Sequence, residues 1–263
     1  MKSILLLLSL CWFGSAAQGA VQGRDVDYEA DGVTLKGYLA YDDAVKGKRP
    51  GVLVVHEWWG QNEYARRRAR MLAALGYTAL AVDMYGNGRT ADNPDEARKL
   101  SGELYSNMPM AKARFEAAMQ LLRNQPTVQA DELAAYGYCF GGGIALNMAR
   151  MGEDLKGVAS FHGGLGTSNP AQPGMIKAHI ISFSGDADPT IGADKVAAFR
   201  KEMDAAGADY RVVIYPGAKH AFTNPDADVL GKKFNMPIAY DAAADKDSWK
   251  QATVFLQDVF AGK

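Results

Sequence analysis

Residues 133–150 read LAAYGYCFGGGIALNMAR, an apolar strand pattern that passes directly into a helical pattern. The turn between them, residues 137–141, places a glycine two residues before and two residues after Cys139. This G-x-C-x-G spacing is that of a nucleophile elbow, a strained turn that lifts a reactive side chain out of a sheet. A thiol at a helix N-terminus also feels the positive end of the helix dipole, which favours thiolate. The alternative interpretation is a small buried cysteine, a common core residue.

The alternation of strand and helix patterns continues on both sides of this turn. Continuous apolar runs separated by helical patterns predict a mostly parallel sheet with helices on both faces, an α/β fold. An alternating stretch around Asp31-Gly32 predicts an N-terminal antiparallel hairpin. Residues 224–236 lack clear periodicity and are a candidate flap over a site. We expect core strands at residues 51–56, 78–86, 133–139, 157–164, 179–185 and 210–216, and helices near 62–75, 110–123, 142–151, 193–206 and 240–260.

Length and composition indicate one globular domain over residues 21–263. Of the 263 residues, 48% are hydrophobic and 22% are charged, which suits a full-sized core. The net charge of -1 gives no electrostatic reason to expect nucleic acid or an anionic membrane as a partner. The basic run RRRAR, residues 66–70, lies in a helical pattern and is interpreted as a solvated helix face rather than a binding patch. We expect a monomer.

Residues 1–20 predict a secretory signal peptide. Lys2 precedes an apolar run over residues 4–13, and the small residues 15–17 offer a cleavage site. Because this run is too short for a permanent anchor, we expect an exported protein, periplasmic or secreted, without membrane contact once the signal is removed. A lipoprotein modified at Cys11 is disfavoured, since Leu10 stands where a small residue is expected. Cleavage leaves Cys139 as the only cysteine, and an unpaired thiol in an oxidising compartment invites a functional explanation.

Two further strand ends carry residues that fit a catalytic triad. Asp186 and Asp188 follow the strand HIISFSG, and His220 follows the last expected strand. The chain order of nucleophile, acid and histidine is the order found in α/β-hydrolases. His220 would accept the Cys139 proton while an aspartate orients the imidazole. Asp188 is preferred because it fits G-x-x-D counted from Gly185, and Asp186 is the alternative.

The motif HEWWG, residues 56–60, follows the first core strand and supplies a candidate oxyanion hole. Acyl transfer needs two backbone N–H donors for the developing oxyanion. We expect them from Phe140, the residue after the nucleophile, and from Trp58. Two adjacent tryptophans at a strand end cannot both face one core, so one of them, assigned as Trp59, is expected to line the pocket.

Three other histidines compete with His220 for the role of base. His56 precedes the nucleophile in the chain, and His179 begins a strand at the wrong end of the sheet. His162 follows a strand and remains a candidate for the pocket. No HExxH or CxxC spacing occurs, so we expect neither a metal nor another cofactor.

With these residues in place, the mature chain resembles the dienelactone hydrolase family over essentially its whole length. The motifs HEWWG, GYCFGG, SGDADP and YPGAKHAF correspond in order and spacing, as does the terminal AYDAAADKDSW. The resemblance implies an α/β-hydrolase fold and a Cys-His-Asp triad formed by Cys139, His220 and Asp188. It also implies that Glu57 contacts the resting thiol and moves away when substrate binds.

The chain departs from this family at two positions that bind a substrate carboxylate in members acting on dienelactone. Those members carry arginines in a D-x-Y-x-R and an H-x-F-x-R stretch. Here both arginines are replaced, by Asn87 and Asn224, and Arg89 is a candidate substitute. The same two stretches add Tyr85 and Phe222 to the expected pocket residues. An anionic dienelactone is therefore in doubt as the substrate.

These features predict a carboxylic ester or lactone hydrolase that acts on a small-molecule substrate through an acyl-cysteine. One alternative is an exported binding protein that keeps the fold without turnover. Another is a thiol redox protein, although the mature chain lacks a resolving cysteine.

Overall fold

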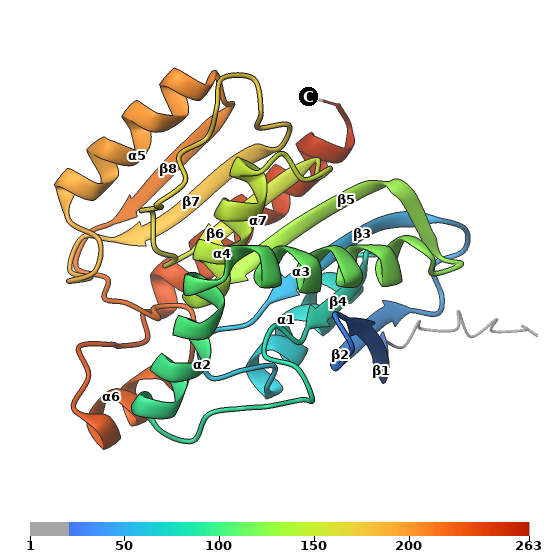
Figure 1. The fold of residues 1–263 in the computed structure, drawn as a ribbon, viewed down its shortest axis with the longest axis horizontal. Coiled ribbons are helices and arrows are strands. Elements are labelled where there is room, and N and C mark those ends of the chain that lie inside the picture. The colour runs from blue at the N-terminus through green and yellow to red at the C-terminus, as the bar shows by residue number, and fades with distance from the viewer. Residues whose placement is uncertain (1–20, 263) are drawn as a thin grey trace, which may run out of the picture.

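The computed structural model describes residues 21–262, in which eight strands form one sheet (Figure 1). The strand order is β1-β2-β4-β3-β5-β6-β7-β8. Strand β2 pairs antiparallel with β1 and with β4, and all other neighbours are parallel. The strands are β1 (Val21–Ala30), β2 (Val33–Asp42), β3 (Arg49–Val55), β4 (Thr78–Val82), β5 (Val128–Tyr138), β6 (Gly157–Phe161), β7 (His179–Gly185) and β8 (Tyr210–Tyr215). The predicted α/β architecture with an N-terminal hairpin is confirmed.

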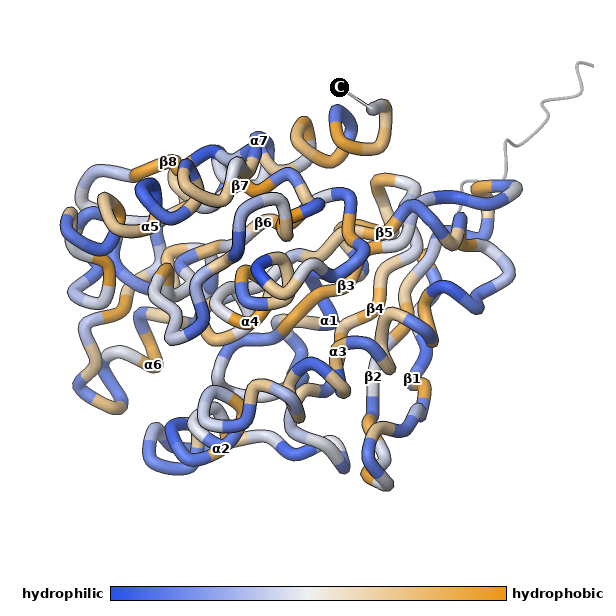
Figure 2. Tube along the Cα trace, turned by 45° about the horizontal axis from the view of Figure 1, so that its top comes forward, coloured by the Kyte–Doolittle hydropathy of each residue, from blue (hydrophilic) through white to orange (hydrophobic). Residues whose placement is uncertain are grey.

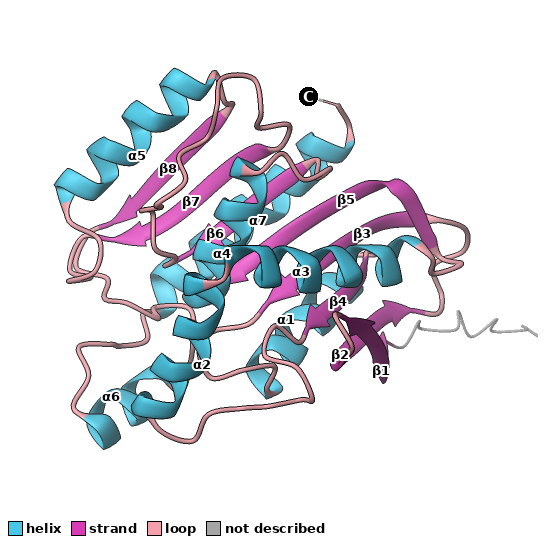
Figure 3. Cartoon of the chain, viewed as in Figure 1, coloured by secondary structure: helices cyan, strands magenta, loops and turns pink. Residues whose placement is uncertain are grey.

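Helices cover both faces of this sheet (Figure 3). One buried cluster joins residues of α3, α4 and α5 to one face, and a second cluster joins α1 and α7 to the other. Helices α2 and α6 lie beyond the ends of the strands, at the same end of the molecule (Figure 1). The helices are α1 (Glu63–Ala74), α2 (Pro94–Ser106), α3 (Met108–Arg123), α4 (Phe140–Arg150), α5 (Ala193–Ala206), α6 (Ala227–Phe234) and α7 (Ala242–Phe260).

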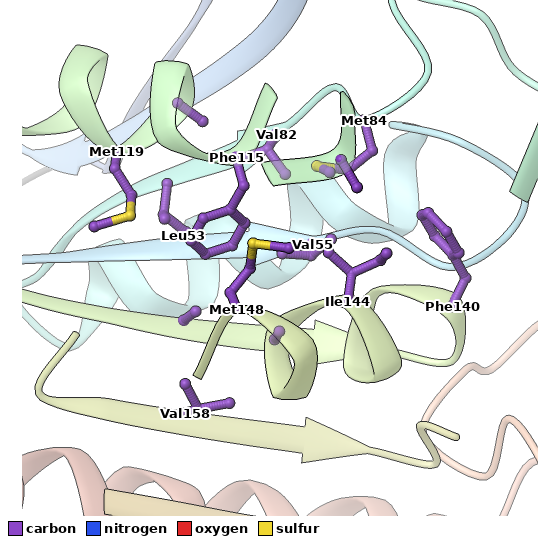
Figure 4. Packing of buried hydrophobic residues seen from close by; sticks show 14 of the residues in the cluster. Leu53, Val55, Val82, Met84, Phe115, Met119, Phe140, Ile144, Met148 and Val158 are labelled. Carbon is purple, nitrogen blue, oxygen red and sulfur yellow. The ribbon is translucent and has the colours of Figure 1, made fainter. Parts of the chain in front are cut away.

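The central strands are buried on both faces, which explains their continuous apolar sequences. In Figure 2 the middle of the sheet is coloured mainly as hydrophobic, whereas much of α2 is hydrophilic. Phe115 and Met119 of α3 pack with Ile144 and Met148 of α4 over Leu53 of β3 (Figure 4). This packing fixes α4, and therefore the turn that precedes it, against the sheet.

Two expected strands end earlier than their apolar patterns indicate. Strand β4 stops at Val82 because the Asp83 carboxylate accepts hydrogen bonds from the backbone N–H groups of Tyr85, Gly86 and Gly88, which therefore cannot pair in the sheet. Strand β6 stops at Phe161 because His162 adopts a left-handed φ of 42°. Both breaks lie at carboxyl ends of strands, where the chain turns toward the candidate site.

Helices α2 and α6 were not predicted. Helix α2 nevertheless carries a clear start signal, since the Asn93 side chain accepts hydrogen bonds from two backbone N–H groups and Pro94 follows it. Helix α6 has eight residues and falls inside the stretch 224–236 that we interpreted as a flap. Its apolar positions are too few to give a period by themselves.

The predicted signal peptide, residues 1–20, and the lipoprotein alternative at Cys11 lie outside the described residues. Across residues 21–262, no helix combines the length and the apolar character needed to cross a bilayer.

Candidate active site

Cys139 lies in a strained turn between β5 and α4. Its backbone has φ 52° and ψ -116°, a conformation that L-residues rarely adopt. The flanking glycines are required by close packing: a Cβ on Gly137 would lie 2.1 Å from the Gly141 carbonyl oxygen, and one on Gly141 would lie 2.3 Å from the Val55 carbonyl oxygen. The predicted elbow geometry is thus present, and Cys139 is half-buried in it.

The structure brings Cys139, His220 and Asp188 into one hydrogen-bonded line. Nε2 of His220 lies 3.0 Å from Cys139 Sγ, and Nδ1 lies 2.7 Å from Asp188 Oδ2. Asp188 is itself fixed, because its Oδ1 accepts hydrogen bonds from the backbone N–H and the hydroxyl of Thr190 at 2.8 and 2.7 Å. Asp186, the alternative acid, is exposed and accepts a hydrogen bond from the Gly217 N–H instead.

Electrostatics in this line favour a charged imidazole. Burial opposes the charged form of His220, but the neighbouring Cys139 sulfur and the hydrogen bond to Asp188 outweigh it and raise the pKa of His220 well above its usual value. Burial likewise works against the Asp188 carboxylate, yet hydrogen bonds from His220 and Thr190 hold the pKa of Asp188 below its ordinary value. The site therefore favours a protonated His220 imidazole beside an ionised Asp188 carboxylate.

The expected oxyanion donors belong to rigid peptides. Phe140 is the first residue of α4, so its N–H has no partner within the helix. The peptides on either side of Trp58 are both held: the Glu57 carbonyl lies 2.5 Å from His56 Nδ1, and the Trp58 carbonyl accepts the Tyr85 hydroxyl at 2.8 Å. His56, a rival base by sequence, is fully buried here and serves this loop.

Glu57 is buried and pairs with Asn224, whose Nδ2 donates to Glu57 Oε2 at 2.6 Å. Burial raises the pKa of Glu57 to about 7, although the Asn224 hydrogen bond and the nearby charge of His220 pull it down. The resemblance implies a resting contact between this carboxyl group and the thiol. In this structure the hydrogen-bond partner of the carboxyl group is Asn224, while the thiol faces His220.

A cavity of about 980 Å³ opens over the thiol. Its walls come from the loop after β3 (residues 57–59), from one face of α2, and from the stretch that includes α6. The residues that line it are mainly apolar or aromatic, and Arg98 is the basic side chain among them besides His220. The lining residues are Glu57, Trp58, Trp59, Asn93, Pro94, Asp95, Arg98, Ser101, Tyr105, Cys139, Phe140, Gly164, Pro189, Thr190, His220, Ala221, Asn224, Ala227, Leu230, Phe234, Asn235, Met236, Pro237 and Ile238.

Of the seven residues predicted for the pocket, Trp59 and Asn224 lie in this lining. Three others, from the stretch after β4, do not. Tyr85 is fully buried, and its hydroxyl donates to the Trp58 carbonyl. Arg89 turns back, donating to the Tyr85 carbonyl and pairing with Glu103 at 3.8 Å. Asn87 is exposed and sits in a turn with φ 55°. In this structure Arg89 therefore does not reach the cavity in place of the missing arginines.

The remaining two predicted pocket residues, His162 and Phe222, are fully buried and do not line the cavity. The His162 ring packs edge-on against both His220 and Phe222, with ring centroids 5.3 Å apart in each case. His179, the last rival base, lies at the start of β7, as its position in the sequence predicts, and there it pairs with Asp209.

Several lining residues escaped the sequence prediction, because they belong to the two helices that were missed. Tyr105 of α2 stacks edge-on against Phe140 and donates to its carbonyl at 3.2 Å. Phe234 of α6 stacks against Trp59 with centroids 5.9 Å apart. The Asn93-Pro94 start signal is the one feature of the sequence that could have identified the first of these helices.

Sequence and structure comparisons with known proteins place the chain in a family. The model of the dienelactone hydrolase family matches residues 35–260. The chain belongs to this family. It is similar to "Protein usf" of Aquifex pyrophilus, with 29% identity over 90% of this chain and 98% of that protein. A dienelactone hydrolase-like promiscuous phosphotriesterase from metagenomic libraries superposes with a TM-score of 0.84 and 32% identity, covering 92% of this chain and 99% of that one. The predicted family and α/β-hydrolase fold are thereby confirmed.

A further relative carries a substrate in its name. The chain is 30% identical to a Bradyrhizobium protein named as a probable 2-oxo-3-(5-oxofuran-2-ylidene)propanoate lactonase, over 90% of this chain and 95% of that protein. Family membership makes this protein a dienelactone hydrolase-like hydrolase, which is the coarser part of the function predicted above.

Proposed function

We propose that this protein hydrolyses uncharged esters or lactones through a covalent acyl-Cys139 intermediate. The observation that carries the proposal is the line from Cys139 Sγ to His220 Nε2 and from His220 Nδ1 to Asp188, at 3.0 and 2.7 Å, which ends at a thiol in the wall of a large cavity. Nucleophile, base and orienting carboxylate within hydrogen-bond reach of one another are the parts that covalent acyl transfer needs.

In the acylation step, the Cys139 thiolate attacks the carbonyl carbon and a C–S bond forms. The carbonyl oxygen becomes an oxyanion, which the N–H groups of Trp58 and Phe140 are placed to stabilise. When this intermediate collapses, the C–O bond to the leaving group breaks and the alkoxide takes the proton of the His220 imidazolium. The alcohol leaves, or in a lactone remains attached to the acyl chain.

In the deacylation step, neutral His220 takes a proton from water as the water oxygen attacks the thioester carbon. The second tetrahedral intermediate collapses with cleavage of the C–S bond. The products are a carboxylic acid and the thiolate–imidazolium pair, so one water is consumed for each ester. Asp188 holds the imidazole so that Nε2 faces the sulfur throughout.

The cavity indicates the character of the substrate. Asn224 occupies one position at which carboxylate-binding relatives carry arginine, and it faces the neighbouring carboxyl group of Glu57. Arg98 stands at the exposed N-terminal part of α2 and pairs with Asp95 at 2.8 Å. The apolar side chains of Trp59, Leu230 and Phe234 are available for a hydrocarbon portion of the substrate. Uncharged esters with an apolar group fit these walls better than small carboxylate-bearing esters or lactones.

The experiment is a p-nitrophenyl ester assay combined with mass spectrometry of the digested protein. Wild type should release p-nitrophenol and, on rapid acid quenching, show an acyl adduct on the peptide containing Cys139. Cys139→Ala should lose activity by about 10⁴-fold or more, because members of a triad act as a unit. Ala187→Ser, an exposed substitution beside Asp188, serves as the control. Retained turnover in Cys139→Ala would refute the mechanism, and binding without release would favour a non-catalytic binding protein.

A further inference from the structure

A buried chain of hydrogen bonds runs behind the triad and ends on the backbone of the nucleophile. The Cys139 N–H lies within reach of two acceptors, the Phe161 carbonyl oxygen at 2.9 Å and His162 Nδ1 at 3.1 Å. On its other side, His162 Nε2 lies 2.7 Å from the Thr223 hydroxyl. His162 thus links the elbow after β5 to the loop that carries His220.

The direction of these bonds follows from proton accounting. Since His162 Nδ1 accepts from the Cys139 N–H, that nitrogen carries no proton. Burial, together with the positive charges of His220 and Arg68, holds the pKa of His162 well below its usual value, so the ring is neutral. A neutral ring with a bare Nδ1 must carry its proton on Nε2, which therefore donates to Thr223 Oγ1.

Thr223 is anchored in turn by a buried cation. Its hydroxyl lies 2.6 Å from the Tyr64 hydroxyl, and its carbonyl accepts a hydrogen bond from Arg68 at 2.6 Å. Arg68 also donates to the Tyr64 hydroxyl at 3.2 Å and pairs with Asp245 at 2.6 Å, with only 4% of its side chain exposed. The series of hydrogen bonds that begins at the Cys139 N–H therefore ends at an ion pair between α1 and α7, the two helices on one face of the sheet.

We propose that His162 and Thr223 are positioning residues that set the distance between Cys139 and His220. His162 touches both partners, through the Cys139 N–H and through its ring contact with His220. Thr223 lies three residues after His220 in the same loop, so its hydrogen bond to His162 ties that loop to the elbow. The proposal rests on the proposed Cys139–His220 chemistry, since it concerns the geometry of that pair.

The strained backbone makes such a tie necessary. Cys139 and His162 both hold left-handed φ angles, 52° and 42°, and such conformations persist only where surrounding contacts enforce them. The hydrogen bond between the Cys139 N–H and His162 Nδ1 joins these two positions directly. Without the anchor at Thr223, the His162 ring could turn and the Cys139 sulfur could move away from His220. A displacement of about 1 Å at a reacting group can lower the rate by about a hundredfold.

The test removes separately the two hydrogen bonds of His162, one with the Cys139 N–H and one with the Thr223 hydroxyl. Thr223→Val removes the hydroxyl while keeping the shape, and Thr223→Ser restores it. His162→Asn retains an acceptor near the Cys139 N–H, and His162→Gln retains a group near Thr223. Thr78→Val is the matched control, because Thr78 is also fully buried and bonded through its hydroxyl, to Thr127, but lies at the opposite end of the sheet.

Two readouts are needed, kcat and KM for a neutral ester, and the pH profile of Cys139 alkylation by iodoacetamide. Thr223→Val should lower kcat by roughly tenfold to a hundredfold with little change in KM, and shift the alkylation profile to higher pH. Thr223→Ser should recover most of both, and each His162 variant should resemble Thr223→Val. Thr78→Val should leave kcat and the profile unchanged, even if its melting temperature falls.

A Thr223→Val protein that unfolds more easily but keeps the wild-type kcat and alkylation profile would overturn the proposal. The hydrogen bonds through His162 and Thr223 would then stabilise the fold without positioning Cys139. Alkylation needs no substrate, so it tests the positioning role even if the wild type hydrolyses no ester. Failure of the proposed function would instead appear in the wild type, as an absence of turnover and of any acyl adduct on Cys139.

Discussion

Replacing the buried carboxyl group of Glu57 by an amide should make the protein more stable at neutral pH. A carboxyl group in an unfolded chain has a pKa near 4.5, whereas burial raises that of Glu57 to about 7. Between these values the native state keeps a proton that the unfolded state has released, so the free energy of unfolding falls as the pH rises. Below the lower pKa, the Glu57 carboxyl group is protonated in both the native and the unfolded state. Its burial then costs no free energy of ionisation.

The size of the effect follows from the gap between the two pKa values. Each pKa unit is worth roughly 1.4 kcal/mol, so ionisation of Glu57 costs on the order of 3 kcal/mol at pH 8. Gln is isosteric with the protonated form. Wild type and Glu57→Gln should therefore have similar stabilities at pH 4.5, and the variant should be more stable by about that amount at pH 8.

The assay is urea unfolding of both proteins at several pH values between 4.5 and 8, with the difference in free energy of unfolding plotted against pH. Groups that titrate alike in both proteins cancel in this difference. Glu29→Gln is the control, since it makes the same change at an exposed position of β1 and should give a flat difference. A flat or falling difference for Glu57→Gln would refute the reasoning, because it would mean that burial does not hold Glu57 protonated.

Two further predictions concern substrate charge and export. Wild type should hydrolyse a neutral ester with a kcat/KM at least equal to that of a matched carboxylate-bearing analogue, and Asn224→Arg should shift this ratio toward the anion by about tenfold, since charge-assisted hydrogen bonds are worth roughly 1.5–3 kcal/mol. An unchanged ratio would mean that position 224 does not meet the substrate. Expressed with its own leader in a bacterial host, the protein should lose about 17 to 20 residues, which mass measurement of the N-terminus will show. An intact Met1 on the active form would exclude the secretory signal.

The elbow was predictable because its signal, two glycines around one cysteine between a strand pattern and a helix pattern, is local in the sequence. Gly137 and Gly141 stand at fixed offsets from Cys139, and each is demanded by backbone that its Cβ would strike. The succession of strands along the chain follows from similar local patterns of apolar runs and turns. The same patterns place Asp188 after β7 and His220 after β8. These features needed no knowledge of which side chains meet across the molecule.

The cavity was less predictable, because its walls depend on side-chain direction and on tertiary contacts. Arg89 is close in sequence to the missing arginine position, but its guanidinium turns back to the Tyr85 carbonyl, which no pattern reveals. Leu230 and Phe234 acquire their role only when α6 packs over Trp59. His162 appeared to be a pocket residue because it follows a strand, and only its contacts show that it lies behind the thiol.

The surroundings of three titratable groups near the thiol shift their pKa values in different directions. These shifts bear on which substrates the cavity accepts. His220 is held charged, His162 is held neutral, and burial keeps Glu57 protonated up to about pH 7. Above that pH, Glu57 places a negative charge in the cavity wall, where Asn224 offers it only a neutral amide. A carboxylate entering the cavity would then meet repulsion, whereas a neutral ester would not. We therefore expect any discrimination against anionic substrates to increase as the pH rises through 7.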